Sequence, residues 1–338
     1  MKLFRSVLVS SAVLVASALP AAMAQASPAA PVGVCQMFRW TALGTAGGPA
    51  PTAERAEPSN LLQAGGRSYL VDTGDGTVNQ LAKVGVNLGS IAAVFISHHH
   101  NDHTGGLAAV IGLRWMNQFP GVLTVYGPPG TREMVDGIVA SLQPQARVGF
   151  GLGAHDRPPE TSVRVVELQG GATEMVDDLR VDVAANSHFD HPGPKSATEP
   201  QSLSYRFQLG PRGITYTGDT GPSEAVLMLA KGSNMLVSEV IDLDRLMASI
   251  RLMRKDAPAE LLGNMERHLS SHHLQADTIG KIAAAASVRQ VVLTHFAIPP
   301  GPLAASEQDL RAGIARHYTG QVSLAHDLES FEVNCSVR

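Results

Sequence analysis

The chain has 338 residues, with 26 lysines and arginines against 30 aspartates and glutamates, for a formal net charge of −4. This length is enough for one large α/β domain with a substantial core. The acidic balance argues against a nucleic-acid partner, because clusters of lysine and arginine bind phosphate backbones and the sequence shows none. A small anionic substrate held by metal ions remains compatible with this composition.

The first 24 residues have the pattern of a secretory signal peptide. Lys2 and Arg5 precede an apolar run at residues 6–19, and Ala22 and Ala24 supply the small residues of a cleavage site. The run is shorter than the roughly 20 residues that a membrane span needs, and no later stretch is long and apolar enough. We therefore expect cleavage near Ala24, an Ala- and Pro-rich flexible leader at 25–34, and one domain at 35–338. The mature protein is expected to be periplasmic or secreted, with no membrane span.

Two cysteines, Cys35 and Cys335, lie near the two ends of the mature chain. In an oxidising compartment such a pair is a disulfide candidate, and the loop-entropy relation gives it roughly 4–5 kcal/mol of stabilisation. The alternative is a pair of unpaired thiols. Neither cysteine is close in sequence to a histidine motif, so both are excluded as metal ligands.

The amino-terminal half contains alternating strand and helix patterns. Strands are expected at 36–42, 59–62 and 68–71, followed by a helix at 78–84. Asp72, at the end of the third strand, could orient a ligand histidine or cap that helix, and the sequence leaves both readings open. A buried strand at 92–96 then runs into the sequence His98-His99-His100-Asn101-Asp102-His103, which precedes Gly105 and Gly106.

This histidine-rich segment is a candidate metal site. In extended backbone His98 and His100 point to the same side and His99 to the other, so the first pair can bind one ion. Asp102 and His103 follow where the chain turns, and the turn directs them at a position nearby where a second metal ion could bind. Nitrogen and oxygen donors without a thiolate suit an open, catalytic zinc site. The alternative is an exposed loop that binds metal only adventitiously.

Further candidates follow strands in the rest of the chain. A strand at 121–126 and a helix at 131–142 lead to a connection at 143–161, and strands return at 163–168 and 179–185. His188 follows the last of these strands and is preferred over His191 as a ligand. Strands at 201–209 and 213–217 are expected to form a hairpin. Asp219 follows it and could bridge two ions or cap the helix expected at 223–230. Glu239 ends an apolar strand at 235–240, where a carboxylate needs a partner.

The remaining elements complete the pattern. Residues 241–266 are expected to be helical and to form a lid over the site. His273 precedes a helix at 275–287, and a strand at 288–293 reaches His295. A helix at 306–317 and strands at 321–325 and 331–333 end the chain.

This ordered series of strand-end residues resembles the metallo-β-lactamase superfamily over about residues 40–296. The resemblance implies an α/β fold, a four-layer αββα sandwich with a two-metal site along one edge. Segments 43–45, 69–77, 126–131 and 204–207 are most similar to the RNase Z-like branch. Two features depart from it: Ser238 replaces the histidine before Glu239, and the 143–161 connection is short where RNase Z enzymes carry a long arm that grips transfer RNA. Exported members of this branch resemble arylsulfatases and cyclic-nucleotide phosphodiesterases.

The resemblance also implies roles for the candidate residues. One zinc ion would be held by His98, His100 and His188, the other by Asp102, His103 and His295, and Asp219 would bridge them. Asp102, Glu239 and His273 are the catalytic candidates. His273, oriented by Glu239, would protonate or stabilise the leaving oxygen. The alternative for that pair is a buried salt bridge that anchors the lid.

From the sequence we expect an exported dinuclear-zinc hydrolase of sulfate or phosphate esters, in which a metal-bridging hydroxide attacks a small-molecule substrate. An alternative is a carbon-centred hydrolase, such as a lactonase or β-lactamase, on the same site. A third reading is a metal-binding scaffold used for partner contact, against which the intact ligand set counts. No nucleic-acid partner is expected, and a homodimer is left open.

Overall fold

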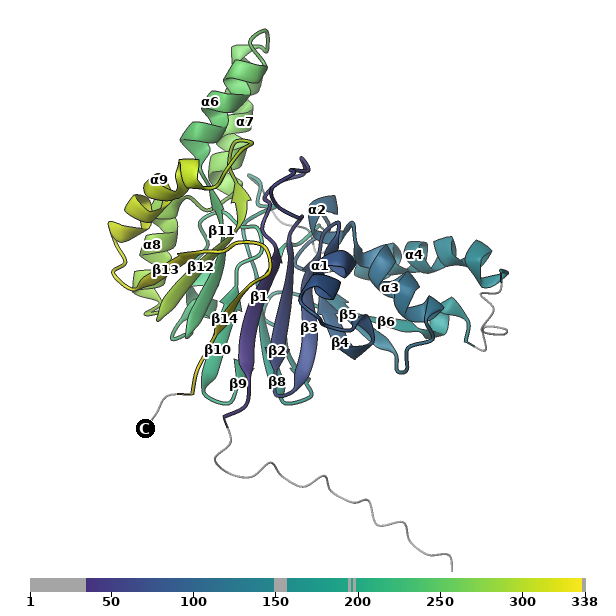
Figure 1. Cartoon of the computed structure of the whole chain (residues 1–338). Coiled ribbons are helices and arrows are strands. Elements are labelled where there is room, and N and C mark those ends of the chain that lie inside the picture. Colours follow the sequence, from purple (N-terminus) through teal and green to yellow (C-terminus); the bar gives the residue numbers. More distant parts are fainter. Residues whose placement is uncertain (1–34, 149–156, 194–195, 197–198, 336–338) are drawn as a thin grey trace, which may run out of the picture. The chain divides into compact units, whose positions relative to one another are not determined.

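The computed structural model describes residues 35–148, 157–193, 196 and 199–335 (Figure 1). The expected signal peptide at 1–24 and leader at 25–34 lie outside the described residues, as does part of the connection at 143–161. Cleavage near Ala24 and export therefore stay predictions. None of the described helices combines the length and the apolar character that crossing a membrane requires. The residues from Cys35 onward form one compact unit by their contacts.

Two seven-stranded mixed sheets form the centre of this unit. The first has the order β14-β1-β2-β3-β4-β5-β6 and the second β13-β12-β11-β10-β9-β8-β7. The strands of the first sheet are β1 Phe38–Gly44, β2 Ser59–Ala64, β3 Arg67–Thr73, β4 Ile91–Phe95, β5 Leu123–Gly127, β6 Val163–Glu167 and β14 Glu329–Glu332. Those of the second are β7 Thr173–Val176, β8 Leu179–Ala185, β9 Leu203–Leu209, β10 Arg212–Tyr216, β11 Met235–Ile241, β12 Gln290–Ala297 and β13 Gln321–Leu324.

Helices cover the outer faces of both sheets. The helices near the first sheet are α1 Thr77–Lys83, α2 Asn101–Thr104, α3 Leu107–Met116 and α4 Thr131–Ala146, with 3₁₀ turns η1 Leu88–Ser90 and η2 Pro159–Thr161. The helices near the second are α5 Glu224–Ala230, α8 Ala276–Ala285 and α9 Ala304–Ala315. Between them in the chain come α6 Leu243–Met253 and α7 Ala259–His272.

Three apolar clusters hold these layers together. The central cluster joins the inner faces of both sheets and includes Trp40, Phe95 and Phe207. A second packs Val94 against Val110 and Leu142 of the helices beside the first sheet. A third packs the opposite face of the second sheet against α8 and α9. Two sheets with helices on both outer sides confirm the predicted four-layer αββα sandwich.

The direction of the strands decides where polar side chains gather. In the first sheet β3 to β6 are parallel, and in the second β10 to β13 are parallel. The carboxyl ends of these strands share one edge in each sheet, and ligand sites in open α/β sheets lie outside such edges. The two edges are joined by hydrogen bonds from the Tyr205 hydroxyl to the Ile96 carbonyl (2.6 Å) and from the Leu203 amide to the Ser97 carbonyl (2.9 Å).

The segment expected to form a lid contains α6 and α7. The two helices lie side by side and project from the sandwich (Figure 1), with an ion pair between Arg251 and Glu266 at 2.5 Å. None of the residues of α7 is fully buried. Both ends of this helical arm meet the sheet edge, because α6 follows β11 directly and the Ile241 amide donates to the Leu274 carbonyl (2.9 Å).

Cys35 and Cys335 form a disulfide that closes a loop with a sequence separation of 300 residues. The alternative of two unpaired thiols is therefore wrong. The bond lies where β1 and β14 pair in antiparallel register, with Arg39 opposite Glu332. It ties the two ends of the described chain across one edge of the first sheet.

Replacing both cysteines by serine is expected to lower the free energy of unfolding by about 2–5 kcal/mol, because an open chain has more conformations to lose on folding. Urea unfolding of oxidised wild type and of the double variant measures this difference. Reductant should shift the wild type toward the variant and leave the variant unchanged. Equal stability of the two oxidised proteins would mean that the cross-link contributes nothing.

Candidate metal centre

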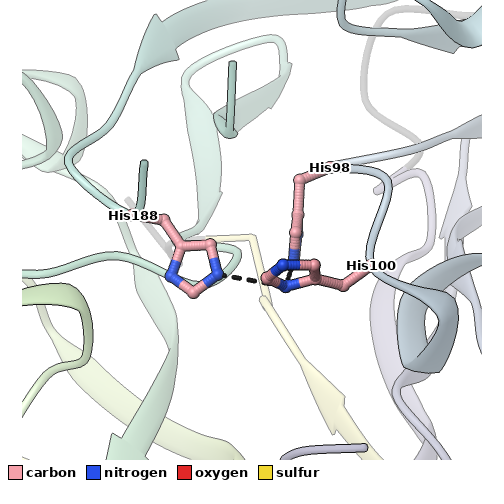
Figure 2. A group of neighbouring side chains, drawn as sticks. All are labelled: His98, His100 and His188. Atoms are coloured by element: carbon pink, nitrogen blue, oxygen red, sulfur yellow. Dashed lines mark hydrogen bonds between the residues drawn. The ribbon is translucent and has the colours of Figure 1, made fainter. Parts of the chain in front are cut away.

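The loop after β4 presents the first group of nitrogen donors. His98 is fully buried, whereas His100 is exposed, and their Nε2 and Nδ1 atoms lie 3.0 Å apart. His188, which follows β8, brings its Nε2 to 3.3 Å from His100 Nδ1 (Figure 2). His99 points away, with its Nε2 2.9 Å from the Thr131 hydroxyl. The three imidazoles His98, His100 and His188 thus converge. The two-residue spacing predicts this for His98 and His100, and the family resemblance adds His188.

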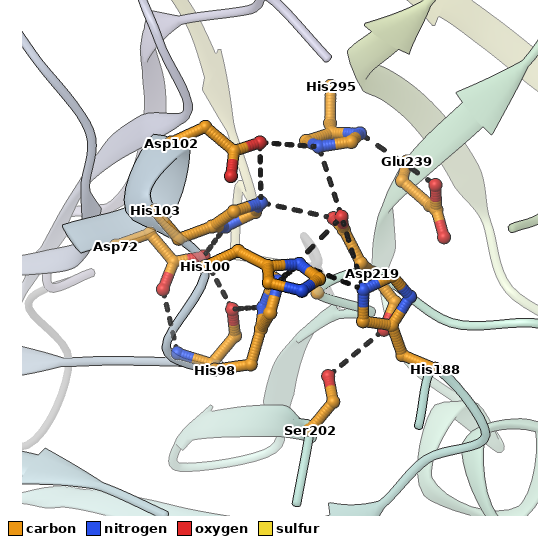
Figure 3. Close-up of polar contacts among 12 residues, drawn as sticks. Asp72, His98, His100, Asp102, His103, His188, Ser202, Asp219, Glu239 and His295 are labelled. Atoms are coloured by element: carbon orange, nitrogen blue, oxygen red, sulfur yellow. Dashed lines mark hydrogen bonds and ion pairs between the residues drawn. The ribbon is translucent and has the colours of Figure 1, made fainter. Parts of the chain in front are cut away.

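A second donor group lies beside the first. The short helix α2 presents Asp102 and His103 from one turn, and His295 comes from β12 of the other sheet (Figure 3). Asp102 Oδ2 lies 3.6 Å from His103 Nε2 and 3.8 Å from His295 Nε2. His295 has a φ of +44°, so its backbone is in the left-handed region that few side chains adopt. Such strain at a site residue is consistent with a functional position.

Asp219 lies between the two groups. One oxygen, Oδ1, is 3.3 Å from His103 Nε2, and the other, Oδ2, is 3.2 Å from His295 Nε2. The same Oδ2 is 3.9 Å from His98 Nε2 and 4.0 Å from His188 Nε2. The carboxylate therefore reaches both groups (Figure 3). The alternative that Asp219 caps α5 is wrong, since Ser223 is the N-cap of that helix.

The donor set fits two metal ions. Three buried atoms that point into the site, His103 Nε2, His295 Nε2 and Asp219 Oδ1, have no hydrogen-bond partner. Buried polar atoms without partners are costly, and a cation between them removes that cost. The donor atoms of His98, His100 and His188 lie within 4.8 Å of one another, as do those of Asp102, His103 and His295. Nitrogen and carboxylate donors without thiolate suit zinc and similar divalent ions.

Asp72 orients the second group from behind. Its carboxylate accepts hydrogen bonds from the Ser97 amide (2.7 Å), the Ser97 hydroxyl (2.8 Å), His103 Nδ1 (2.8 Å) and the Tyr216 hydroxyl (2.8 Å). Helix α1 has Gly76 as its N-cap with no side-chain cap, so the capping alternative for Asp72 is wrong. A carboxylate behind a ligand histidine fixes the tautomer that leaves Nε2 free for metal.

The charges around the two groups differ. Burial lowers the pKa of His188 to about 4 and holds the pKa of His98 well below its usual value, so both rings are neutral. Burial also disfavours charge on His295, but the carboxylates of Asp219 and Asp102 outweigh it and raise the pKa of His295 to about 10. Asp219 and Asp72 raise the pKa of His103 in the same way. Without metal, protons on these two rings balance the buried carboxylates.

Metal loading near neutral pH is therefore expected to release protons. The raised pKa values mean that His103 and His295 are protonated below these values in the metal-free protein, and each must lose a proton to bind an ion. The apparent metal affinity should rise as the pH rises from neutral toward about 10, the raised pKa of His295. Calorimetric titration with zinc in two buffers of different ionisation enthalpy measures the release, with preloaded protein as the control. A heat independent of the buffer would contradict this account.

Glu239 and His273 form the predicted pair. Glu239 is 1% exposed, and its Oε2 accepts a hydrogen bond from His273 Nδ1 at 2.7 Å. The Thr220 amide donates to its other oxygen at 2.5 Å. Burial raises the pKa of Glu239, while for His273 the carboxylate outweighs burial and raises the pKa. The ring of His273 lies 5.0 Å from that of His188, so the pair adjoins the donor groups. Its catalytic role stays a prediction.

An open cleft of about 660 Å³ leads to the donor groups on the side of His100 and His188. His191, the second choice for a ligand, lies on its wall with Nε2 3.2 Å from Glu199 and belongs to neither group. Sequence reasoning missed Phe189 and His272 of this cleft. The His272 carbonyl accepts a hydrogen bond from His188 Nδ1 at 2.9 Å, a main-chain contact that side-chain patterns do not encode.

Comparisons with known proteins agree with this geometry. The Beta-lactamase superfamily domain matches residues 67–296. Ribonuclease Z of Mycobacterium avium is 32% identical over 304 residues, which cover 88% of this chain and 99% of the relative. Ribonuclease Z of Mycobacterium marinum is 31% identical over 304 residues, with the same coverage.

Solved structures with the same fold are more distant in sequence. The metallo-beta-lactamase fold protein YhfI of Bacillus subtilis has a TM-score of 0.63 at 20% identity and covers 88% of this chain and 100% of that one. The short form of human tRNase Z has a TM-score of 0.58 at 20% identity and covers 87% of this chain and 98% of that one.

These comparisons correct two expectations from the sequence. The expected exported hydrolase of small sulfate or phosphate esters, with its carbon-centred alternative, is contradicted by relatives named Ribonuclease Z that match over nearly their whole length. The exclusion of a nucleic-acid partner is contradicted by the same relatives. The expectation rested on the expected export, the short 143–161 connection and the acidic net charge. The net charge averages over the whole surface and omits the positive charge that bound ions bring to a buried site.

Proposed function

The chain belongs to the β-lactamase superfamily and to its RNase Z-like branch, and from this membership we propose that it is a ribonuclease that cleaves phosphodiester bonds in RNA. Its relatives and its donor residues make it a metal-dependent hydrolase whose site fits two metal ions. We infer that the metal is zinc, that the substrate is RNA and that the bond broken is a phosphodiester.

One observation carries the proposal. A chain that is 32% identical to a ribonuclease Z over 99% of that protein also brings all seven predicted donor residues together where the edges of its two sheets meet. The seven come from four separate segments, the loop after β4 with the adjoining helix α2, the loop after β8, the loop after β10, and β12. Such convergence makes a scaffold without catalysis a poor reading, because partner contact does not require a buried two-ion site. The donor residues are His98, His100, Asp102, His103, His188, Asp219 and His295.

The chemistry of the site suits a phosphodiester. When bound, two divalent ions supply Lewis-acid charge beside the scissile phosphate and make a water molecule more acidic. Asp72 keeps His103 in one tautomer, and the His272 carbonyl does the same for His188. These contacts hold the donors in place before substrate arrives, which lowers the cost of organising the site during the reaction.

His273 is the candidate general acid. Glu239 accepts a hydrogen bond from His273 Nδ1 at 2.7 Å. This contact fixes the His273 ring and favours its charged form. The opposite nitrogen is then free to give a proton to the ribose oxygen that leaves phosphorus. The Thr220 amide, next to Asp219, holds the other Glu239 oxygen, so the acid and the bridging carboxylate share one support.

Cleavage of RNA by the zinc-loaded protein tests the proposal. The substrates are a transfer RNA with an extended 3′ end and a single-stranded oligonucleotide, and the products are mapped by gel and mass spectrometry. We expect metal-dependent cleavage that chelator abolishes and added zinc restores. Turnover of bis(4-nitrophenyl) phosphate or 4-nitrophenyl sulfate without cleavage of either RNA would contradict the proposal. A preparation of Asp219→Ala controls for a contaminating nuclease.

A further inference from the structure

Phe189 lies against the metal-binding groups without belonging to them. It follows His188 in the chain, and its ring centroid lies 4.9 Å from that of His188, 5.2 Å from His100 and 5.6 Å from His98. These are the three imidazoles of Figure 2. The side chain is only half-buried and is part of none of the three apolar clusters. An aromatic ring thus stands partly exposed beside the place where the scissile phosphate must sit.

Two cavities meet at this ring. Phe189 lines the cleft of about 660 Å³ that leads to the donor groups, and it also lines a neighbouring cavity of about 230 Å³. The second cavity is bordered by Gln169 and Gln201, whose amides can hydrogen-bond to a polar ring edge, and Gln201 Oε1 is buried without a hydrogen-bond partner in the described residues. A nucleobase stacked on Phe189 would therefore have space in both cavities, and the side-chain amides would lie near its polar edge.

The charges on this side of the cleft separate the two parts of a nucleotide. Asp190 and Glu199 line both cavities with Phe189. His191 Nε2 lies 3.2 Å from Glu199 Oε2 as an ion pair on the cleft wall. A phosphate is attracted by cations at the donor groups, whereas the Phe189 ring carries no charge to hold it. The uncharged base is the part of a nucleotide that fits beside Phe189.

We propose that Phe189 is the stacking platform for the nucleobase next to the scissile phosphate. This inference rests on the proposed function, and it assigns Phe189 to a base-binding subsite of the same cleft. Stacking on an aromatic ring accepts every base, because each base has a π-face, so the subsite gives affinity with little sequence preference. The energy of one such contact corresponds to roughly 5-fold to 150-fold in binding.

Binding of adenosine monophosphate and of ribose 5-phosphate to the zinc-loaded full chain separates the base from the phosphate. Isothermal titration calorimetry measures both dissociation constants, and metal content is determined for each preparation. We expect the wild type to bind the nucleotide at least about 5-fold more tightly. Phe189→Leu should reduce this preference to less than about 3-fold, whereas Phe189→Trp should retain or increase it. Phe331→Leu, at a half-buried aromatic of β14, is the matched control and should keep the wild-type preference.

Each outcome decides the inference. An unchanged preference in Phe189→Leu, or equal binding of the two probes by wild type, would overturn it. If the leucine variant does not fold, a loss of preference in the tryptophan variant would overturn it as well. RNA cleavage together with equal binding of the two probes removes the base subsite and leaves the proposed function intact. Nucleotide preference without RNA cleavage supports the subsite and removes the proposed function.

Discussion

Replacing Asp219 by alanine should remove at least one of the two metal ions and reduce RNA cleavage by more than about 100-fold. The carboxylate lies within 4.0 Å of donor atoms from both groups, at 3.3 Å from His103 Nε2 and 3.9 Å from His98 Nε2. Changes to residues that merely orient ligands already cost 10-fold to about 100-fold in metal affinity or activity, and a shared ligand should cost more. Metal content by atomic emission and single-turnover cleavage rates measure the two effects.

Asp136→Ala is the matched control for this variant. Asp136 is an exposed carboxylate on α4, outside both donor groups, so its loss should leave metal content and cleavage unchanged. Full cleavage by Asp219→Ala with two ions retained would show that the ligand assignment is wrong. Loss of both metal and folded structure would be detected by circular dichroism, and Asp219→Asn, which keeps the shape of the side chain, then provides the second comparison.

Replacing Asp72 by asparagine is expected to have the largest effect on stability. The buried carboxylate accepts four hydrogen bonds. In asparagine one oxygen is replaced by an NH₂ group, which cannot accept the hydrogen bonds that this oxygen accepted. Removing one charge from such a buried network costs about 3–5 kcal/mol. Asparagine tolerates the φ of +57° at this position, so backbone strain does not contribute to the difference. Urea unfolding of the metal-free proteins measures the free energy of unfolding.

Metal affinity should fall in the same variant, by 10-fold to about 100-fold, because His103 loses the partner that fixes its tautomer. Tyr216→Phe removes just one of the four donors and serves as the graded control, with an expected cost of about 1 kcal/mol. A wild-type unfolding curve and wild-type zinc affinity for Asp72→Asn would mean that this carboxylate neither stabilises the fold nor orients His103.

Much of the site could be predicted from the sequence because its residues are tied to strand ends. A short apolar run followed by polar donors marks the carboxyl end of a buried strand, and His98, Asp219 and His295 all have this local signal. The spacing of His98 and His100 sets their common side by backbone geometry alone. The resemblance of this ordered series to the metallo-β-lactamase superfamily then implied the αββα sandwich, which the structure confirms.

Charge was a poorer guide. The acidic net charge was one ground for expecting no nucleic-acid partner, yet relatives that match 88% of this chain are named Ribonuclease Z. The field that a substrate meets depends on the few groups beside it and on any bound ions, and a sum over the whole sequence does not contain that information.

The sequence by itself determined which donor side chains follow strand ends, because strand ends depend on local periodicity. The tertiary structure alone decided the contacts between elements distant in the chain. Asp72 faces His103 instead of capping α1, the His272 carbonyl at the end of the helical arm holds His188, and Phe189 lies on three imidazoles. The physical reason is that each of these contacts joins separate strands or helices, and its energy depends on how the two sheets pack, which no local pattern records.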